Sequence, residues 1–252
     1  MELIKNQLDS LCLEFVDYER EYASSISNPN KFWGEKAKTI SWIKKFSKVK
    51  ESFFGDDVKI NWFADGTLNA SFNCLDRHLK DRGDKLAIIW EADDPKLSKK
   101  ISYNELHKEV CKFANGLKSI GVRKGARVTI YMPMIPEAAV AMLACARLGA
   151  IHSVVFGGFA PESLRNRIED CNSSFIITAN EGIRGGKKIP LLSNVKEAVN
   201  GYKDLKKIIV VKRTSSGEFF DKKTDIWYKD LIANQSDFCE ISEQNSEDPL
   251  FI

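Results

Sequence analysis

Short, mostly apolar runs alternate with helix signals along most of the chain, and this alternation restricts the fold more than any other feature of the 252-residue sequence. The runs are apolar almost throughout, whereas a strand with one solvent-facing side would alternate apolar and polar residues. Continuous apolar strands separated by helices are typical of a parallel sheet covered on both faces. We therefore predict an α/β fold with a doubly wound, mostly parallel sheet, its strands at 86–91, 127–132, 151–156, 174–179 and 207–212.

The helices between these runs carry start and stop signals. Ser102 and Glu105 form an S-x-x-E capping box, which predicts a helix beginning directly after Ser102. Pro136 is expected to begin a nearly all-apolar helix that ends at Gly149. The stretch NCLDRHLK at 73–80 is also predicted to be a helix.

The first part of the chain has a less regular pattern than the rest. An amphipathic helix is expected through the apolar positions of 4–22, followed by a turn-rich stretch at 27–35 and an extended piece at 58–69. No alternation of strands and helices is visible there. We therefore divide the chain into an irregular N-terminal segment, 1–73, and a sheet-containing part, 74–252.

Charge and cysteine usage exclude several classes of protein. The 38 basic and 35 acidic residues nearly cancel, so the net charge does not favour nucleic acid or a membrane surface as a partner. The longest apolar run, 138–146, is far too short to span a bilayer. The six cysteines are scattered singly, which indicates reduced thiols and a cytoplasmic protein rather than a disulfide framework or zinc site.

Two loops that follow predicted strands contain glycine pairs, and in an open parallel sheet ligands bind outside the carboxyl ends of the strands. The first pair, Gly157-Gly158, precedes a helix, where free N–H groups favour anions. The alternative is a tight strand-to-helix turn with no ligand.

The second loop, in the sequence GIRGGKKIPL, places Arg184 and Lys187 on either side of Gly185 and Gly186. Guanidinium and ammonium groups around uncovered backbone N–H groups suit a phosphate. A solvated basic loop is an equally good interpretation of these residues alone. The sequence contains no Walker-type or G-x-G-x-x-G motif and no metal-ligand cluster, so no catalytic or metal-binding residue is predicted in it.

Long stretches of the chain, taken together, resemble the AMP-forming acetate–CoA ligases, the acetyl-coenzyme A synthetase family. The resemblance runs from about residue 18 to the end, with its segments in the same order and at similar separation. The stretches that carry it include INWFADGTLNASFNCLDRHL, YMPMIPEAAVAMLACARLGAIHSVVFGGFAPESLRNRIEDC and GIRGGKKIPLLSNVKEAV.

The resemblance implies a two-step reaction. Acetate and ATP form an enzyme-bound acetyl-adenylate and pyrophosphate, and coenzyme A then displaces AMP to give acetyl-CoA. By the same resemblance, Arg184, Gly185, Gly186 and Lys187 contact the phosphorylated adenosine end of coenzyme A, and Gly158 lies along its path. Many relatives carry arginine where this chain has Lys187, which keeps the charge but loses bidentate recognition.

The resemblance also implies that residues 74–252 are the first part of the large AMP-binding domain. The sites for ATP, Mg2+ and acetate, and the catalytic residues, are expected beyond Ile252, where the apolar run EDPLFI ends the sequence. We therefore expect an N-terminal piece that catalyses neither half-reaction alone, and self-association through apolar surface that the missing part would cover. A propionate or other short-chain acyl–CoA ligase, and a non-catalytic module that binds coenzyme A, are the alternatives.

Overall fold

The computed structural model describes residues 15–217 and 219–252. It divides into two compact units, which are described separately. The first contains Met1–Leu68 with Asn245–Glu247, and the second contains Asn69–Gln244 with Asp248–Ile252. No helix in the described ranges is long and apolar enough to cross a membrane.

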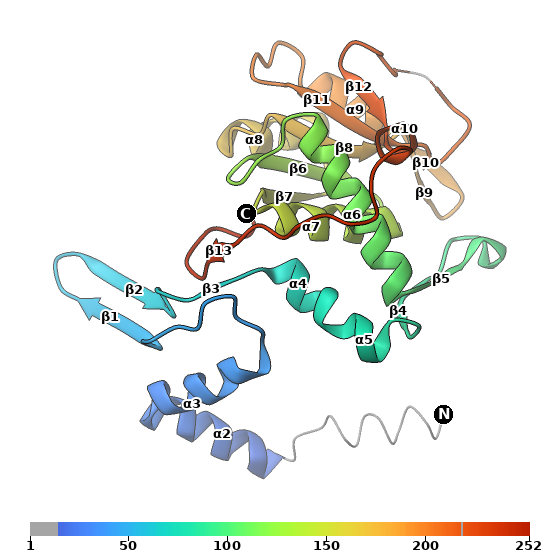
Figure 1. Cartoon of the computed structure of the whole chain (residues 1–252). Coiled ribbons are helices and arrows are strands. Elements are labelled where there is room, and N and C mark those ends of the chain that lie inside the picture. Colours follow the sequence, from blue (N-terminus) through green and yellow to red (C-terminus); the bar gives the residue numbers. More distant parts are fainter. Residues whose placement is uncertain (1–14, 218) are drawn as a thin grey trace. The chain divides into compact units, whose positions relative to one another are not determined.

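A five-stranded sheet forms the centre of the second unit (Figure 1). Its order is β12-β11-β8-β6-β7, and every neighbouring pair is parallel. This confirms the predicted α/β fold with a parallel sheet, because four of the five expected apolar runs supply four of its strands. The strands are β6 (Arg127–Met132), β7 (Ile151–Phe156), β8 (Phe175–Ala179), β11 (Lys207–Val211) and β12 (Asp225–Trp227).

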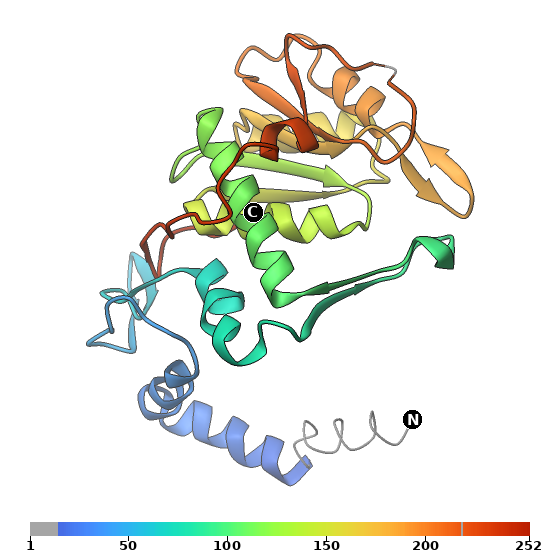
Figure 2. The ribbon, with the colours of Figure 1, turned by 45° about the vertical axis from the view of Figure 1, so that its right-hand side comes forward.

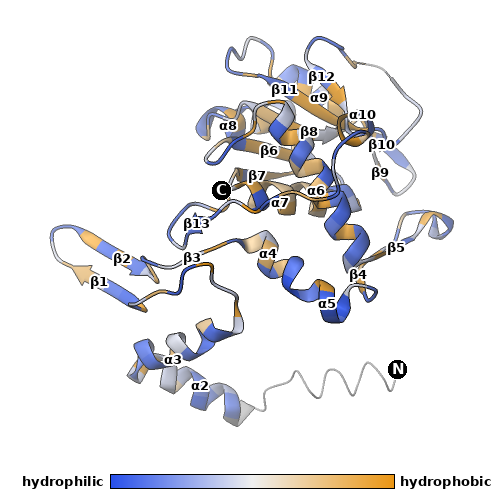
Figure 3. Ribbon diagram, in the orientation of Figure 1, coloured by the Kyte–Doolittle hydropathy of each residue, from blue (hydrophilic) through white to orange (hydrophobic). Residues whose placement is uncertain are grey.

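The helices of this unit pack in two groups. One group contains α6 (Tyr103–Ser119), α7 (Pro136–Leu148) and α10 (Tyr228–Ile232), and the other contains α8 (Pro161–Asp170) and α9 (Leu191–Ala198). Much of β6, β8, β11 and α7 is hydrophobic (Figure 3). They form one continuous core, in which all five residues of β8 are buried.

The predicted helix signals operate as expected. Ser102 Oγ accepts the Glu105 amide at 3.3 Å, and the Glu105 carboxylate accepts the Ser102 amide at 2.7 Å, which completes the capping box of α6. Helix α7 begins at Pro136, and Gly149 ends it in the left-handed conformation with φ of 68°. A side chain at this backbone angle is disfavoured, so glycine is the natural residue there.

The expectation that residues 86–91 belong to the main sheet is wrong. Strand β4 (Leu86–Trp90) pairs antiparallel with β5 (Lys99–Ser102) in a separate two-stranded sheet, visible as the long green hairpin in Figure 2. The physical reason is the short connection between the two strands, since a parallel crossover needs about a dozen residues or more.

The predicted helix at 73–80 is also only partly correct. The segment is split into α4 (Ala70–Cys74), a 3₁₀ turn (Asp76–His78) and α5 (Leu79–Arg82). The break occurs at Leu75, whose backbone leaves the helical region (φ −123°, ψ −70°) while its side chain is 1% exposed. Burial of this leucine accompanies the interruption of the helix.

The first unit contains short elements, but the stretch at 27–35, expected to be turn-rich, is mostly the helix α3 (Pro29–Lys36). The Asn28 side chain caps this helix, and Pro29 occupies its first turn. Residues before Phe15 lie outside the described part, so the predicted N-terminal helix can be compared only from that residue onward. There the structure contains α2 (Phe15–Ser27).

Three aromatic side chains, those of Trp42, Phe46 and Phe63, pack against one another with ring centroids 4.6–5.5 Å apart. The remaining elements are a 3₁₀ turn (Ala37–Thr39), the β1–β2 hairpin (Lys50–Phe54, Val58–Trp62) and β3 (Thr67–Leu68), while β13 is Gln244–Asn245.

The last residues of the sequence lie beside the edge strand β7. Phe251 forms an isolated parallel bridge with His152, and the Ile252 amide donates to the His152 carbonyl at 3.0 Å. The apolar run at 249–252 therefore pairs with β7 through a single bridge, as its strand-like composition suggests.

Candidate ligand-binding site

The basic glycine segment is a β-hairpin and not the open loop that we expected. Strand β9 (Gly182–Arg184) pairs antiparallel with β10 (Lys187–Ile189), and Arg184 lies directly opposite Lys187. The two residues between them, Gly185 and Gly186, have φ of 56° and 72°. Positive φ at both positions of a two-residue turn is the type I′ geometry, which matches the twist of a hairpin and favours glycine. The hairpin projects from the sheet (Figure 2).

This register places two cations on one face of the hairpin. Residues directly opposite in an antiparallel pair have their Cβ atoms about 4.5–5.5 Å apart, and like charges in this position are destabilising. Arg184 and Lys187 are both exposed, and neither forms an ion pair with any residue that the structure describes. Lys188, on the opposite face, lies 3.4 Å from the Glu181 carboxylate. The hairpin therefore presents an unneutralised cation pair that an anion would stabilise.

The other predicted glycines lie in the turn after β7, and the structure separates their roles. A Cβ on Gly157 would lie 3.0 Å from the Met132 carbonyl oxygen, so glycine there allows close backbone packing. The three atoms nearest to a Cβ on Gly158 would all belong to the ring of Phe156, the first at 2.5 Å, and that side chain is exposed. The tight-turn interpretation therefore accounts for Gly157, whereas the backbone imposes no comparable constraint on Gly158.

A buried tyrosine anchors this glycine turn. The Tyr131 hydroxyl donates to the Phe159 carbonyl at 2.7 Å and accepts from the Asn194 side-chain amide at 3.1 Å. Burial raises the pKa of Tyr131, so the hydroxyl keeps its proton. Sequence reasoning missed both residues, because neither a strand tyrosine nor a helix asparagine signals a partner so distant in sequence.

Both glycine segments lie at the carboxyl edge of the sheet. They follow β7 and β8, which flank β6 on its two sides. This is the crevice in which open α/β sheets bind ligands. The strand order thus brings the turn containing Gly158 and the hairpin with Arg184 and Lys187 to the same edge.

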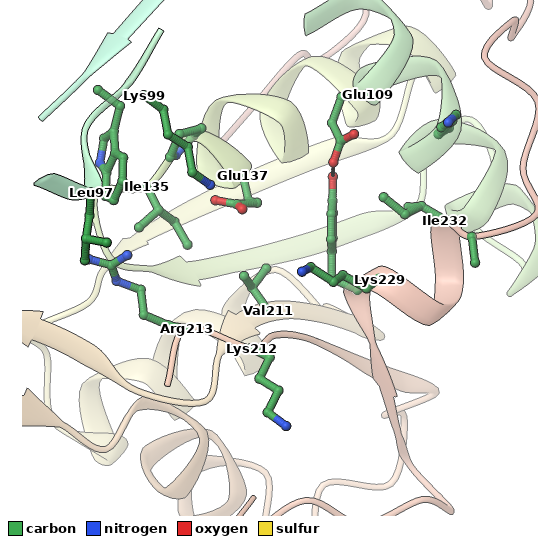
Figure 4. Close-up of a pocket in the computed structure, with 15 residues that line it drawn as sticks. Leu97, Lys99, Glu109, Ile135, Glu137, Val211, Lys212, Arg213, Lys229 and Ile232 are labelled. Carbon is green, nitrogen blue, oxygen red and sulfur yellow. Dashed lines mark hydrogen bonds between the residues drawn. The ribbon is translucent and has the colours of Figure 1, made fainter. Parts of the chain in front are cut away.

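A separate hollow of about 720 Å³ lies in the same unit (Figure 4), and none of the predicted site residues lines it. Several of its charged groups already have partners. Arg213 and Lys99 lie 5.0 and 5.8 Å from the centre of the Trp90 ring, and the Tyr228 hydroxyl donates to Glu109 at 2.7 Å. We assign no ligand to this hollow, which contains none of the residues predicted to bind one.

Asp76, Arg147 and His107 form a buried structural cluster of titratable residues. The Arg147 guanidinium, almost fully buried, donates to both oxygens of Asp76 at 2.8 and 2.9 Å, and to the Cys239 carbonyl at 2.7 Å. His107 Nε2 lies 3.2 Å from Asp76 and 3.5 Å from Cys111. The hydrogen bond to Asp76 is the main reason that the pKa of His107 rises to about 9. Burial opposes ionisation of Asp76, but these hydrogen bonds outweigh it and hold its pKa below the ordinary range.

Neither this cluster nor His152 offers catalytic machinery. Burial lowers the pKa of His152, and its Nδ1 has no hydrogen-bond partner among the described residues. Within the same ranges there is no group of three or more His, Cys, Asp or Glu residues that could hold a metal ion. The described arrangement presents two cations on one face of the hairpin, a geometry that suits an anion.

Family models match almost the whole chain. Residues 75–252 match the AMP-binding enzyme family, and residues 18–74 match the N-terminus of acetyl-coenzyme A synthetase.

Curated relatives agree with these matches. The acetyl-coenzyme A synthetases of Parvibaculum lavamentivorans and Shewanella frigidimarina are each 56% identical over 236 and 238 residues, which is 93% of this chain. The chain spans only 36% and 37% of the length of these relatives. An acetoacetyl-CoA synthetase from Streptomyces lividans has a similar fold, with a TM-score of 0.79 and 23% identity over 91% of this chain and 34% of that one.

Proposed function

The chain belongs to the AMP-binding enzyme family, and from this premise we propose that it acts as part of an AMP-forming acetate–CoA ligase. The overall reaction would convert acetate, ATP and coenzyme A into acetyl-CoA, AMP and pyrophosphate through an acetyl-adenylate. The identity of 54–56% with acetyl-coenzyme A synthetases supports acetate as the acyl substrate.

Within this reaction, the β9–β10 hairpin would bind the phosphorylated adenosine end of coenzyme A. The observation that carries this proposal is the unneutralised pair Arg184 and Lys187, opposite each other across the Gly185-Gly186 turn. Phosphate oxygens between two cations relieve their repulsion and form charge-assisted hydrogen bonds. Lys187 would act as a point charge, and Arg184 as the bidentate donor.

Gly158 would let the coenzyme A chain pass close to the backbone at the neighbouring turn. The lack of a backbone constraint on this glycine supports a role in admitting a ligand. The Tyr131 hydrogen bond to the Phe159 carbonyl would hold the turn in place.

ATP and Mg2+ are proposed as substrate and metal of the whole reaction. The residues described here do not fit a metal, since no group of three or more ligating side chains occurs among them. We derive no step through Mg2+ and assign it no residue of this chain.

The finer architecture is likewise a proposal. The strand order β7-β6-β8-β11-β12 corresponds to 2-1-3-4-5 in chain order, which with right-handed crossovers would place the two helix groups on opposite faces, as in doubly wound folds.

We propose that the chain divides into two functional parts, residues 1–73 and residues 74–252. The five described cysteines are free thiols, which supports the cytoplasm as the compartment.

Self-association is proposed through the edge of the sheet. Val154, Phe156 and Phe251 are 54%, 58% and 66% exposed along and beside β7, and exposed apolar groups at an open strand edge favour pairing. Light scattering should show a concentration-dependent increase in mass, and Val154→Lys should reduce it. A strict monomer at high concentration would contradict this proposal.

Calorimetric titration of the 252-residue chain with coenzyme A and with 3′-dephospho-coenzyme A tests the proposed site. The parent should bind coenzyme A more tightly, and Arg184→Ala/Lys187→Ala should weaken binding at least about tenfold, since a charged hydrogen bond contributes about 1.5–3 kcal/mol. Lys222→Ala/Lys223→Ala removes the same charge from another exposed loop and should have little effect. Equal binding of coenzyme A by the parent and the hairpin variant would rule out the phosphate role.

A further inference from the structure

The side chain of Asn180 joins the base of the hairpin to the loop that follows β11. Asn180 is 4% exposed and lies directly after β8. Its amide nitrogen donates to the Thr214 carbonyl at 3.2 Å, the Thr214 hydroxyl at 2.9 Å and the Ser216 carbonyl at 2.7 Å. Its amide oxygen accepts from the backbone N–H groups of Arg213 and Thr214 at 2.8 and 3.3 Å. One buried amide therefore connects two segments that are distant in the sequence.

Glu181 adds a second connection at the same point. Its carboxylate accepts the Thr214 hydroxyl, and this hydrogen bond is the main reason that the pKa of Glu181 is lowered. The same carboxylate oxygen lies 3.4 Å from Lys188 Nζ in β10. Glu181 thus contacts both the loop after β11 and the returning strand of the hairpin.

The hairpin needs such an attachment to keep one direction. Its strands are three residues long, and an isolated two-stranded hairpin is at best marginally stable in water. Its tip is open, because nothing lies within 4 Å of a Cβ built on Gly185 or Gly186. The hydrogen bonds of Asn180, Glu181 and Thr214 therefore hold the base of a hairpin whose turn glycines have open space at their Cβ positions.

We infer that Asn180, Glu181 and Thr214 are positioning residues, which orient the Arg184 and Lys187 face of the hairpin for a phosphate group. The ion pair also divides the three cations by role. Glu181 neutralises Lys188 on one face, whereas Arg184 and Lys187 on the other face have no ion-pair partner among the described residues. The inference rests on the proposed coenzyme A site for its ligand. Its mechanical part, that the three residues hold the hairpin in one orientation, requires no ligand.

Limited proteolysis with trypsin tests the mechanical part. Thr214→Val removes the hydroxyl that contacts both Asn180 and Glu181 while keeping the side-chain volume and the net charge. We expect cleavage after Arg184, Lys187 or Lys188 to become about tenfold faster, because the loss of these hydrogen bonds favours local opening. Glu169→Gln, which removes the carboxylate that Arg165 contacts at 2.8 Å on α8, is the matched control and should leave hairpin cleavage unchanged. Cleavage of Thr214→Val at the parental rate would overturn the inference.

Titration with coenzyme A and 3′-dephospho-coenzyme A tests whether positioning matters for binding. Thr214→Val should bind coenzyme A about five- to tenfold more weakly and should lose part of the preference for the 3′-phosphorylated form. Glu181→Gln distinguishes the two roles of the carboxylate, which are neutralising Lys188 and holding the hairpin. If the carboxylate only neutralises Lys188, the variant will bind coenzyme A more tightly and its hairpin will stay resistant to trypsin. That result would contradict the positioning role.

The two proposals fail in different ways. A parent chain that does not discriminate between the two forms of coenzyme A would contradict the phosphate site, and the trypsin data would still decide whether the three residues hold the hairpin. Faster cleavage of Thr214→Val with parental affinity and preference would overturn positioning while the proposed site stands.

Discussion

Replacing Asp76 with asparagine should destabilise the second unit strongly. The substitution keeps the shape of the side chain but removes the charge that faces the Arg147 guanidinium. The side chains of Arg147 and Asp76 are 2% and 16% exposed, so water cannot replace the lost partner. Breaking a buried ion pair by removing one member costs about 3–5 kcal/mol, because the other charge stays buried and uncompensated. This is a large part of the roughly 5–15 kcal/mol by which a folded domain is stable.

The same substitution should change how stability depends on pH. The folded-state pKa of His107, about 9, is above its ordinary value of 6.5, so protonated His107 stabilises the fold. This contribution is complete below about pH 6.5 and is lost as the pH rises through about 9. Its full size is on the order of 3 kcal/mol. In Asp76→Asn the main cause of the shift is absent, so the decline between pH 6.5 and 8.5 should become much shallower.

Urea unfolding followed by far-ultraviolet circular dichroism, at pH 6.0, 7.5 and 8.5, measures both effects. Asp170→Asn, at an exposed position at the end of α8, is the control and should shift the free energy of unfolding by less than about 0.5 kcal/mol. A loss below about 1 kcal/mol in Asp76→Asn at pH 6.0, or an unchanged pH dependence, would refute the assignment of this cluster as a stabilising buried network.

Further predictions concern backbone conformation and thiol reactivity. Gly149→Ala should cost about 1–2 kcal/mol in urea unfolding, because its φ of 68° is left-handed and its new Cβ would lie 2.1 Å from the Gln244 side chain; parental stability would disprove this. Gly185→Asn should preserve the hairpin, as judged by trypsin resistance, whereas Gly185→Val should open it, because asparagine tolerates the type I′ turn; equal behaviour would contradict the turn assignment. Among the five described cysteines, the exposed Cys74 should be alkylated first and the buried Cys145 last, because burial raises the pKa of the Cys145 thiol to about 12. Peptide mass mapping measures this order, and the reverse order would show that the burial pattern is wrong.

The elements that could be predicted from the sequence are those whose causes are local. The continuous apolar runs at 127–132 and 151–156 are the strands β6 and β7, because a strand buried on both faces has little choice of residue type. The capping box at Ser102 and the terminal Gly149 likewise depend on neighbours within one helical turn. In the candidate site, the cations and glycines could be identified, because their charge and lack of side chains are properties of the residues themselves.

Other features required the tertiary structure, since their partners are distant in the sequence. The run at 86–91 has the same apolar composition as the central strands, but the short connection to β5 led it to pair antiparallel with that strand. The two-residue turn that aligns Arg184 with Lys187 also became visible only with the register.

The sequence by itself determined a parallel α/β core, because burial of apolar strands and helix capping act over a few residues. The family is shown by the similarity of long stretches of the chain to known members. Only the tertiary structure decided which charged groups are neutralised. Arg147 lies in the core with Asp76 as its partner, and Lys188 lies 3.4 Å from the Glu181 carboxylate, which also accepts the Thr214 hydroxyl. Electrostatic interactions depend on distance in space, and that distance is set by the packing of segments that the sequence keeps far apart.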